Sequence, residues 1–432
     1  MVIPLSTSLK YYKRADVQEA MIAAATNKEI AVLYGERGFG KRPDSINHPA
    51  DILEFAKHGA TSFHCSEELW SNPLAISTSM SKKDIEQLRI GWDLVLDIDC
   101  PVFEYSTIAA DLIVDALRHG GIETISAKFS GNHGWHIAVP FEAFPKEVKG
   151  QPTSQLFPEG PKKIAFYLQE KIRAALSDKL LSIAPVDKIA KRVGKKMVDV
   201  VKGHENRVFD PFSIITIDTV FIAHRHLYRM PYSLNEKSGL VSIPFSPKKI
   251  LFFEKESARP DLVVVKEGFL NRKAEAGEAK RLFLEALDFK PELTFVEKRP
   301  EQIQSIVFES AISEAHFPPC IKNILKGLPD GRKRSVFVLL NFLKNCKWDY
   351  GTIESLLYEW NKKNSTPLKE GLIRAQLNYH KRQNKTILPP NCKEFYQNFG
   401  VCTPDSFCSK IKNPVNYALL KAKLAKQVKK NF

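Results

Sequence analysis

Two aspartates, Asp97 and Asp99, close an apolar segment that reads Gly-Trp-Asp-Leu-Val-Leu-Asp-Ile-Asp-Cys at residues 91–100. Because side chains alternate between the two faces of a strand, both carboxylates should project together, with Leu96 and Ile98 on the opposite face. Carboxylates held this close repel each other, and a divalent cation bound through their oxygens removes that cost. The pair predicts a metal site; the alternative is a solvated strand end, where aspartate is also common.

A second polar group lies on a glycine-flanked turn, Ser-Gly-Asn-His-Gly-Trp-His at residues 130–136. Glycine lets backbone amides approach an anion closely, and the side chains of Ser130, His133 and His136 add hydrogen-bond donors. Each histidine taken alone is more often a surface residue or a buried structural one. Together the residues predict an anion-binding turn.

A third carboxylate, Asp218, ends an extended run at 214–218, and a basic segment at 224–240 follows it. The arginines and lysines of this segment surround a proline turn, which suits a triphosphate or a nucleic-acid backbone.

Residues 35–41, Gly-Glu-Arg-Gly-Phe-Gly-Lys, have the glycine and lysine spacing of a phosphate-binding P-loop. However, Arg42 stands where a hydroxyl should bind magnesium, and Pro43 and Pro49 interrupt the helix that should follow. We therefore interpret this segment as a basic, mobile loop near a phosphate site.

Five of the seven cysteines follow residue 306. Cys346 stands alone and is interpreted as a plain buried thiol. The other four are Cys320, Cys392, Cys402 and Cys408. The intervals between them are 71, 9 and 5 residues, unlike the paired spacing of common zinc modules. Spacing alone leaves zinc, an iron-sulfur cluster and buried structural thiols open.

The composition favours a polyanionic partner, because the 432 residues carry a net charge of +15 and their lysines and arginines are spread along the whole length. A merely soluble basic surface is the alternative. The sequence contains no run of about 18 apolar residues, so no membrane-spanning helix is predicted. The N-terminus lacks the features of a signal peptide, and we therefore expect a cytoplasmic protein. In that compartment a disulfide framework is not expected.

The elements that must position these groups form an α+β pattern with mixed or antiparallel sheets over residues 1–253, including a lysine-rich helical insertion at about 155–206. Residues 254–305 are expected to form a helical linker region, with one helix from Asn271 to Leu287. Apolar residues at helical spacing between Ile321 and Trp360 predict an all-α domain over 306–432. The length supports such a division.

Taken in order, the motifs around Asp97, residues 130–136 and residues 218–239 resemble those of the catalytic subunit of archaeal and eukaryotic DNA primases. Residues 59–68 also look like archaeal members. The C-terminal part, with its four cysteines, Pro318-Pro319 and residues 331–335, resembles the iron-sulfur domain of the primase large subunit. The chain thus looks like a single-chain fusion of the two.

This resemblance implies a primase that synthesises short RNA or DNA primers de novo on single-stranded DNA by two-metal nucleotidyl transfer for DNA replication. The ligands of the two Mg²⁺ or Mn²⁺ ions, and the catalytic residues, would be Asp97, Asp99 and Asp218. The nucleotide-binding residues would be Ser130, His133, His136, Arg229, Lys28, Arg42 and Lys237.

The resemblance also implies a [4Fe-4S] cluster on Cys320, Cys392, Cys402 and Cys408, with zinc as the lesser alternative. Arg332 and Arg334 would contact the initiating nucleotide or the primer 5′ end. The expected partners are a single-stranded DNA template, an RNA or DNA primer, NTP or dNTP, and transient replication proteins around a monomer. Two alternatives remain: a primase-polymerase that extends primers or bypasses lesions but starts chains poorly, and a non-enzymatic nucleic-acid-binding protein.

Three positions depart from the family pattern. His133 stands where the family often has arginine, Asn235 where it has histidine, and Lys28 where it frequently has arginine. The ammonium of Lys28 is a point charge, whereas the guanidinium of an arginine can bind a phosphate through two nitrogens, so weaker triphosphate binding is expected. The zinc-binding cysteine cluster of many catalytic subunits is absent, because only Cys65 and Cys100 lie in that half.

Overall fold

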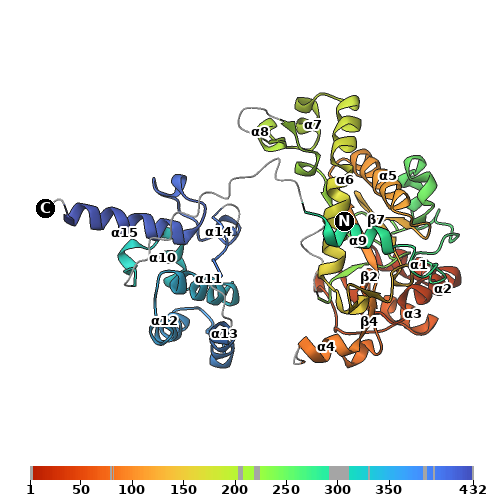
Figure 1. Ribbon diagram of the computed structural model, residues 1–432. Helices are drawn as coiled ribbons and strands as arrows, with labels where there is room; N and C mark the ends of the chain where they lie inside the picture. The colour runs from red at the N-terminus through yellow and green to blue at the C-terminus, as the bar shows by residue number, and fades with distance from the viewer. Residues whose placement is uncertain are drawn as a thin grey trace. The chain divides into compact units, whose positions relative to one another are not determined.

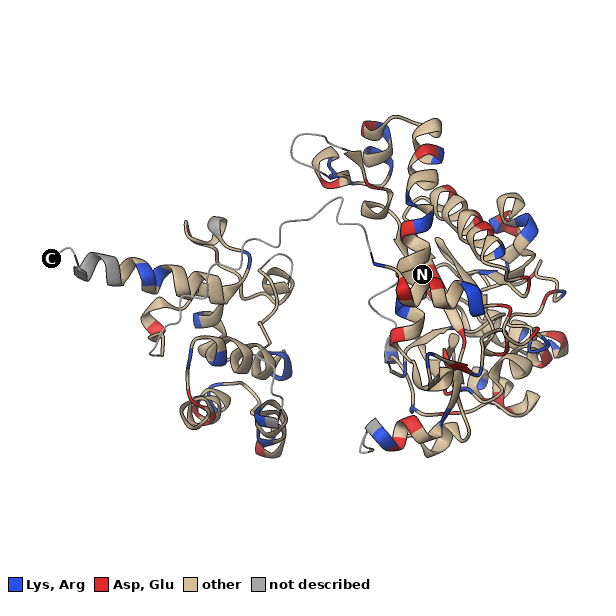
Figure 2. Ribbon diagram, in the orientation of Figure 1, with Lys and Arg blue, Asp and Glu red and all other residues tan. Residues whose placement is uncertain are grey.

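The computed structural model describes residues 3–77, 80, 82–202, 208–217, 224–290, 311–328, 331–382, 387–392 and 395–430. The chain divides into two compact units, Met1–Phe295 and Val296–Phe432, which we call the N-terminal and C-terminal units (Figure 1). Lysine and arginine occur along both units, interspersed with acidic residues (Figure 2). Among the described residues, no helix combines the length and the apolar character that crossing a bilayer requires.

The larger sheet of the N-terminal unit has five strands in the order β12-β5-β7-β6-β14, and every neighbouring pair is antiparallel. The strands are β12 (Thr216–Ile217), β5 (Leu94–Asp99), β7 (Gly134–Val139), β6 (Ser126–Phe129) and β14 (Pro244–Phe245). Helix α5 (Phe103–His119) packs on β5 and β7, and α6 (Glu159–Ile183) packs on α5. The helical spacing of Ile113 and Leu117, both fully buried, gives α5 the apolar stripe that covers the sheet.

A second antiparallel sheet has the order β1-β2-β13, with β1 (Ile30–Leu33), β2 (Ser62–Ser66) and β13 (Leu227–Arg229). Three helices from the start of the chain pack near it: α1 (Leu5–Tyr12), α2 (Ala15–Ala25) and α3 (Pro49–Lys57). The mixed α+β class predicted from the sequence is therefore confirmed.

The remaining elements of this unit are short. The helices are α4 (Lys82–Leu88), α7 (Val186–Arg192), α8 (Met197–Val200) and α9 (Lys280–Asp288). The two-stranded ribbons are β3 (Glu68–Trp70) with β4 (Arg89–Trp92), β8 (Glu147–Val148) with β9 (Gln151–Pro152), and β10 (Val201–Lys202) with β11 (Val208–Phe209). The lysine-rich insertion is thus mostly helical but also includes β10.

The helix predicted from Asn271 to Leu287 begins only at Lys280, so the first part of that prediction was wrong. Gly277 adopts a φ of +87°, a conformation that a right-handed helix cannot contain. Between 254 and 279 the only helical element is the 3-10 turn Lys255–Ala258, and residues 291–305 lie outside the described part. The exact boundaries of the predicted domains stay a prediction.

The described residues of the C-terminal unit form helices and no strand. The helices are α10 (Pro319–Leu325), α11 (Arg332–Asn345), α12 (Tyr350–Lys362), α13 (Glu370–Arg382), α14 (Phe395–Asn398) and α15 (Pro414–Lys430). Ile321, Leu339, Leu357 and Trp360 lie in one buried core, as their helical spacing predicts.

Candidate functional site

Strand β5 positions the two aspartates of the central motif. Its alternate residues Leu96 and Ile98 are fully buried, whereas the Asp97 side chain is 47% exposed. Asp97 faces His136 of β7 across the ladder, and Asp99 faces Gly134. A Cβ atom at residue 134 would collide with the carbonyl oxygen of Ile98, so glycine is required where β7 approaches the carboxylates.

Both carboxylates line a cavity of about 260 Å³ in the N-terminal unit. Its walls come from five stretches of chain: β2 and the residue after it, β5, the turn at 130–136, β13 with the preceding His226, and residues 235–237. The lining residues are His64, Glu67, Val95, Asp97, Asp99, Ser130, Asn132, His136, His226, Leu227, Tyr228, Arg229, Asn235, Glu236 and Lys237. The fold therefore brings together six of the residues selected from the sequence: Asp97, Asp99, Ser130, His136, Arg229 and Lys237.

The turn at 130–136 is closed by its own hydrogen bonds. The Ser130 amide donates to the Gly134 carbonyl at 2.9 Å, and the Gly134 amide donates to Ser130 Oγ at 3.2 Å. His133 is exposed and does not line the cavity, and its carbonyl accepts a hydrogen bond from Ser106. The structure thus places Ser130 and His136, but not His133, at the carboxylates.

Arg229 is the best-defined cation of the cavity. Its side chain is 11% exposed, and its Nη1 atom lies 2.7 Å from Glu236 Oε2 and 2.9 Å from the Leu234 carbonyl oxygen. Burial opposes ionisation of Glu236, but the Arg229 guanidinium prevails and lowers the pKa of that carboxyl. Arg229 is therefore fixed at the cavity wall by a charged partner.

Asn235 has a structural role in this turn. Its Oδ1 accepts a hydrogen bond from the Lys237 amide at 2.9 Å, and its Cβ lies close to Gly131, whose φ is +96°. The asparagine thus packs the segment before Lys237 against the turn at 130–136.

A buried lysine that sequence reasoning missed lies behind the cavity. Lys128 pairs with His136 in the β6–β7 ladder and is fully buried. Its Nζ donates to Ser242 Oγ at 2.7 Å and lies over the rings of Tyr228 and Phe269. Burial lowers the pKa of Lys128 to about 7. Burial and the nearby Lys128 also hold the pKa of His136 well below its ordinary value, so its imidazole is neutral. The sequence signal that could have identified Lys128 is its place in the short, otherwise uncharged strand Ser-Ala-Lys-Phe.

Three cavity residues on the opposite sheet were also missed. Glu67 is buried, and its Oε1 lies 3.0 Å from Nδ1 of His226. His64 lines the same cavity, and burial lowers its pKa to about 3. These residues lie in segments 59–68 and 224–240, which stand out in the sequence, but their relation to Asp97 arises only when the two sheets face each other.

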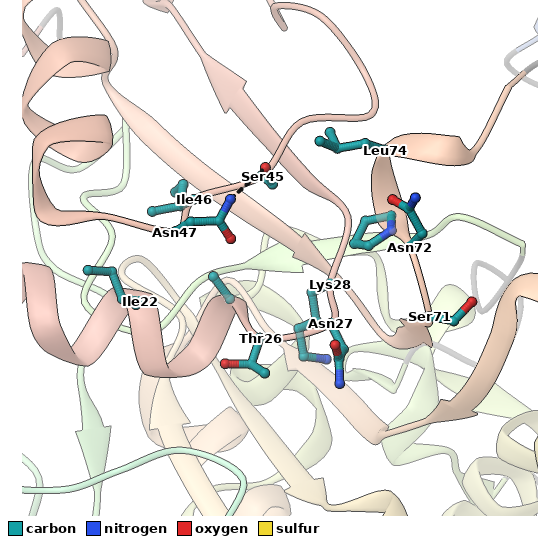
Figure 3. Close-up of a pocket in the computed structure, with 12 residues that line it drawn as sticks. Ile22, Thr26, Asn27, Lys28, Ser45, Ile46, Asn47, Ser71, Asn72 and Leu74 are labelled. Atoms are coloured by element: carbon teal, nitrogen blue, oxygen red, sulfur yellow. Dashed lines mark hydrogen bonds between the residues drawn. The ribbon is translucent and has the colours of Figure 1, made fainter.

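Two predicted nucleotide contacts, Lys28 and Arg42, do not line this cavity, and their role stays a prediction. Lys28 is buried, and its Nζ lies 2.7 Å from both Asp93 Oδ2 and the Ser66 carbonyl oxygen. It lines a separate pocket of about 400 Å³ beside Thr26 and Asn27 (Figure 3). The ion pair with Asp93, a carboxylate 65 residues away, engages the charge of Lys28.

Arg42 lies on Glu29, with Nε 2.9 Å from Oε1, and donates to the Arg225 carbonyl oxygen. Glu29 is completely buried and also pairs with the Arg225 guanidinium. Arg42 thus belongs to a structural ion-pair network. Residues 35–41 form a 3-10 turn at Gly35–Arg37 without a following helix before Pro49, which agrees with the rejection of a P-loop. Asp218 lies outside the described residues.

The four C-terminal cysteines line one small, enclosed cavity of about 30 Å³ in the C-terminal unit. Separate backbone contacts hold three of them: the Cys392 amide donates to Lys412, the Cys402 amide to Tyr396 and the Cys408 amide to Asp405. Cys320 lies in the first turn of α10. The other lining residues are Pro318, Tyr396, Thr403, Pro404 and Ile411.

The donor chemistry of this cavity suits a metal group. Burial, with the neighbouring thiols, raises the pKa of Cys320 to about 12 and that of Cys392 to about 11, as expected for thiols that lack a cation. The Tyr396 hydroxyl beside them is buried without a hydrogen-bond partner in the described part of the chain. No group of three or more His, Cys, Asp or Glu among the described residues is positioned to bind a metal ion as it stands. Four thiols in one apolar cavity nevertheless match the ligand set of a [4Fe-4S] cluster or a zinc ion.

Arg332 and Arg334 lie in the first turn of α11, after Gly331 in a left-handed conformation. Arg332 Nη1 donates to the Thr366 carbonyl oxygen, and the Arg334 guanidinium lies 5.9 Å from the centre of the Phe399 ring. Their side chains therefore rest on other segments of the same unit.

Comparison with known proteins gives a family match for the C-terminal unit. Residues 310–431 match the family model for the C-terminal domain of the large subunit of eukaryotic and archaeal DNA primase. The DNA primase large subunit PriL of Pyrococcus horikoshii is 32% identical over 141 residues, covering 24% of this chain and 36% of the relative. PriL of Thermococcus kodakarensis is 30% identical over 141 residues, covering 24% and 35%. The chain thus spans about a third of the length of these relatives.

One solved structure covers more of the chain at low similarity. The polymerase domain of Mycobacterium tuberculosis Ligase D in complex with DNA aligns with 66% of this chain and 89% of its own, with a TM-score of 0.35 and 15% identity.

Proposed function

We propose that this chain is a DNA primase in which the N-terminal unit joins nucleotides on a single-stranded DNA template and the C-terminal unit carries a cysteine-bound cluster. The observation that carries the proposal is the cavity in which Asp97 and Asp99 meet Ser130, His136 and Arg229. The match of residues 310–431 to a primase large-subunit domain supports it independently.

Phosphoryl transfer requires positioning and charge neutralisation more than covalent participation of the protein. Asp97 and Asp99, together with Asp218, would hold two Mg²⁺ or Mn²⁺ ions, which lower the pKa of the attacking 3′-hydroxyl and neutralise charge on the triphosphate. The two described carboxylates are suited to this role because they share one strand face, and Asp97 is half-exposed to the cavity.

The remaining residues bind the triphosphate. Arg229 engages Glu236 and Leu234 through the same Nη1 atom. Within the described residues no hydrogen bond engages its Nε or Nη2, so that side of its fork would bind phosphate oxygens. Lys237 adds a point charge at the same wall. His136 is neutral, so it contributes a hydrogen bond and orientation rather than charge.

In the C-terminal unit, Cys320, Cys392, Cys402 and Cys408 would hold a [4Fe-4S] cluster, whose main contribution is to fix the surrounding helices. Arg332 and Arg334 then present two cations at the start of α11 to the initiating nucleotide or the primer 5′ end. Zinc is the alternative occupant, and iron and zinc analysis of anaerobically purified protein separates the two.

The decisive experiment incubates the purified chain with unprimed single-stranded DNA, labelled NTP or dNTP, and Mg²⁺ or Mn²⁺. We expect short products from the unsubstituted chain and none from the double variant Asp97→Ala with Asp99→Ala. Asp178→Ala is the matched control, because Asp178 is an exposed carboxylate of α6 that does not line the cavity. Equal product from the double variant would contradict the proposal.

A further inference from the structure

Tyr396 of the C-terminal unit carries a buried hydroxyl at the cysteine cavity. The residue lies in α14 and is 1% exposed, and its hydroxyl has no hydrogen-bond partner within the described residues. A buried hydroxyl without a partner costs free energy, so such an atom points to a group that is to be bound.

The backbone fixes where this hydroxyl lies. The Tyr396 carbonyl oxygen accepts hydrogen bonds from the amides of Val401 and Cys402, both at 3.1 Å. The ring of Phe395 packs edge-on against the Tyr396 ring at 5.1 Å. Tyr396 is thereby tied to a cysteine ligand through its main chain while its side chain lines the cysteine cavity.

A tyrosine hydroxyl can donate a hydrogen bond and adds no charge to the cavity. Besides the cysteines and Tyr396 itself, the cavity is lined by Pro318, Pro404, Ile411 and Thr403, and Thr403 Oγ1 already accepts a hydrogen bond from Asn323 at 2.9 Å. The group that the four thiols would hold is therefore the acceptor that this site favours.

We propose that the Tyr396 hydroxyl donates a hydrogen bond to a sulfur atom of the cluster and thereby makes its reduction potential more positive. Reduction adds negative charge that the cluster sulfurs share, and a hydrogen bond to sulfur stabilises this reduced state. Tyr396 is a positioning residue in this scheme and not a ligand. The inference rests on the iron-sulfur cluster of the proposed function.

The test compares Tyr396→Phe with Tyr350→Phe in the full chain. Tyr350 lies in the same unit, but its hydroxyl is bonded to His380 and does not line the cysteine cavity. Each protein is purified anaerobically, its iron content and its absorbance near ~400 nm are measured, and its one-electron potential is titrated at an electrode. We expect a more negative potential for Tyr396→Phe and an unchanged one for Tyr350→Phe.

Iron-loaded Tyr396→Phe with the potential of the unsubstituted chain would overturn the inference and leave the cluster itself standing. A colourless unsubstituted protein that holds zinc would overturn the cluster and the inference together. If Tyr396→Phe binds no iron, site-specific 3-fluorotyrosine at position 396 decides, because its more acidic hydroxyl is a stronger donor. The protein with 3-fluorotyrosine at position 396 should have a more positive reduction potential than the unsubstituted chain. An unchanged potential would again refute the inference.

Discussion

The carboxylate cavity of the N-terminal unit and the thiol cavity of the C-terminal unit are built in opposite ways. The first has about 260 Å³, is lined by charged and polar side chains, and leaves Asp97 half-exposed. The second has about 30 Å³ and mainly apolar walls around four thiols. Oxygen ligands in an open cavity suit ions and nucleotides that exchange, whereas four thiols around one small, mainly apolar cavity suit a group that stays bound.

This difference predicts that ligand loss has different consequences in the two units. In the N-terminal unit the fold does not depend on the carboxylates, because a core of fully buried residues such as Leu96, Ile113 and Trp135 supports β5 and β7. In the C-terminal unit Cys320 is itself part of the core, and Cys392, Cys402 and Cys408 belong to segments with little regular structure. Activity should respond to the first set, and stability to the second.

The largest effect is expected for Asp97→Asn. Losing one carboxylate from the metal site should reduce primer synthesis by roughly a thousand-fold or more, while the melting temperature of the N-terminal unit is unchanged or rises, because repulsion with Asp99 is relieved. Product formation and thermal unfolding of the same preparation check this. A large loss of stability would show that the carboxylates support the fold and would remove the contrast between the cavities.

The next effect is expected for Cys392→Ser, which should release the cluster and destabilise the C-terminal unit by about 3 kcal/mol or more, since binding of a structural group is folding free energy. Iron content and guanidinium unfolding measure it. Extension of a supplied primer should persist, because the proposed function assigns that chemistry to the N-terminal unit. The matched control is Cys346→Ser, a buried thiol outside the cysteine cavity, which should retain iron.

Substitution of Arg229 sharpens the assignment inside the first cavity. Removing a charge-assisted contact to phosphate costs about 1.5–3 kcal/mol, so Arg229→Ala should raise the KM for nucleotide about 10- to 100-fold. Arg42→Ala is the control, because its guanidinium lies on Glu29 outside the cavity. If Arg229→Ala and Arg42→Ala have similar KM values for nucleotide, the position of Arg229 in the cavity gives it no special role in nucleotide binding.

Expressed per pH unit, the smallest effect is the one expected for Lys128. Its folded-state pKa of about 7 lies below the ordinary value of 10.5, so between these values the unfolded chain binds more protons. Stability should therefore rise with pH in this window, with a slope of up to about 1.4 kcal/mol per pH unit, and level off below pH 7. Guanidinium unfolding at several pH values tests this.

Lys128→Met should flatten that slope, whereas Lys248→Met, at an exposed position, should leave it unchanged. If the unfolding free energy of Lys128→Met keeps the same slope with pH, the pH dependence arises from another group.

Much of the fold was predictable because the signals are local. The alternating apolar residues of β5, the helical spacing of α5 and the run of helices after Pro319 were all read from periodicity. The helix start at Lys280 was not predicted, because the sequence pattern does not show that Gly277 adopts a positive φ.

By itself, the sequence determined the kinds of chemistry: two aspartates at i and i+2, a glycine-flanked turn and four cysteines specify oxygen and sulfur donors through local geometry. The tertiary structure decided which groups meet. It placed Arg229 and Lys237 at the carboxylates, engaged Lys28 with Asp93, and buried Tyr396 beside the thiols. These contacts join residues far apart in the chain, and burial and ion pairing, which the sequence does not encode locally, set their charge and direction.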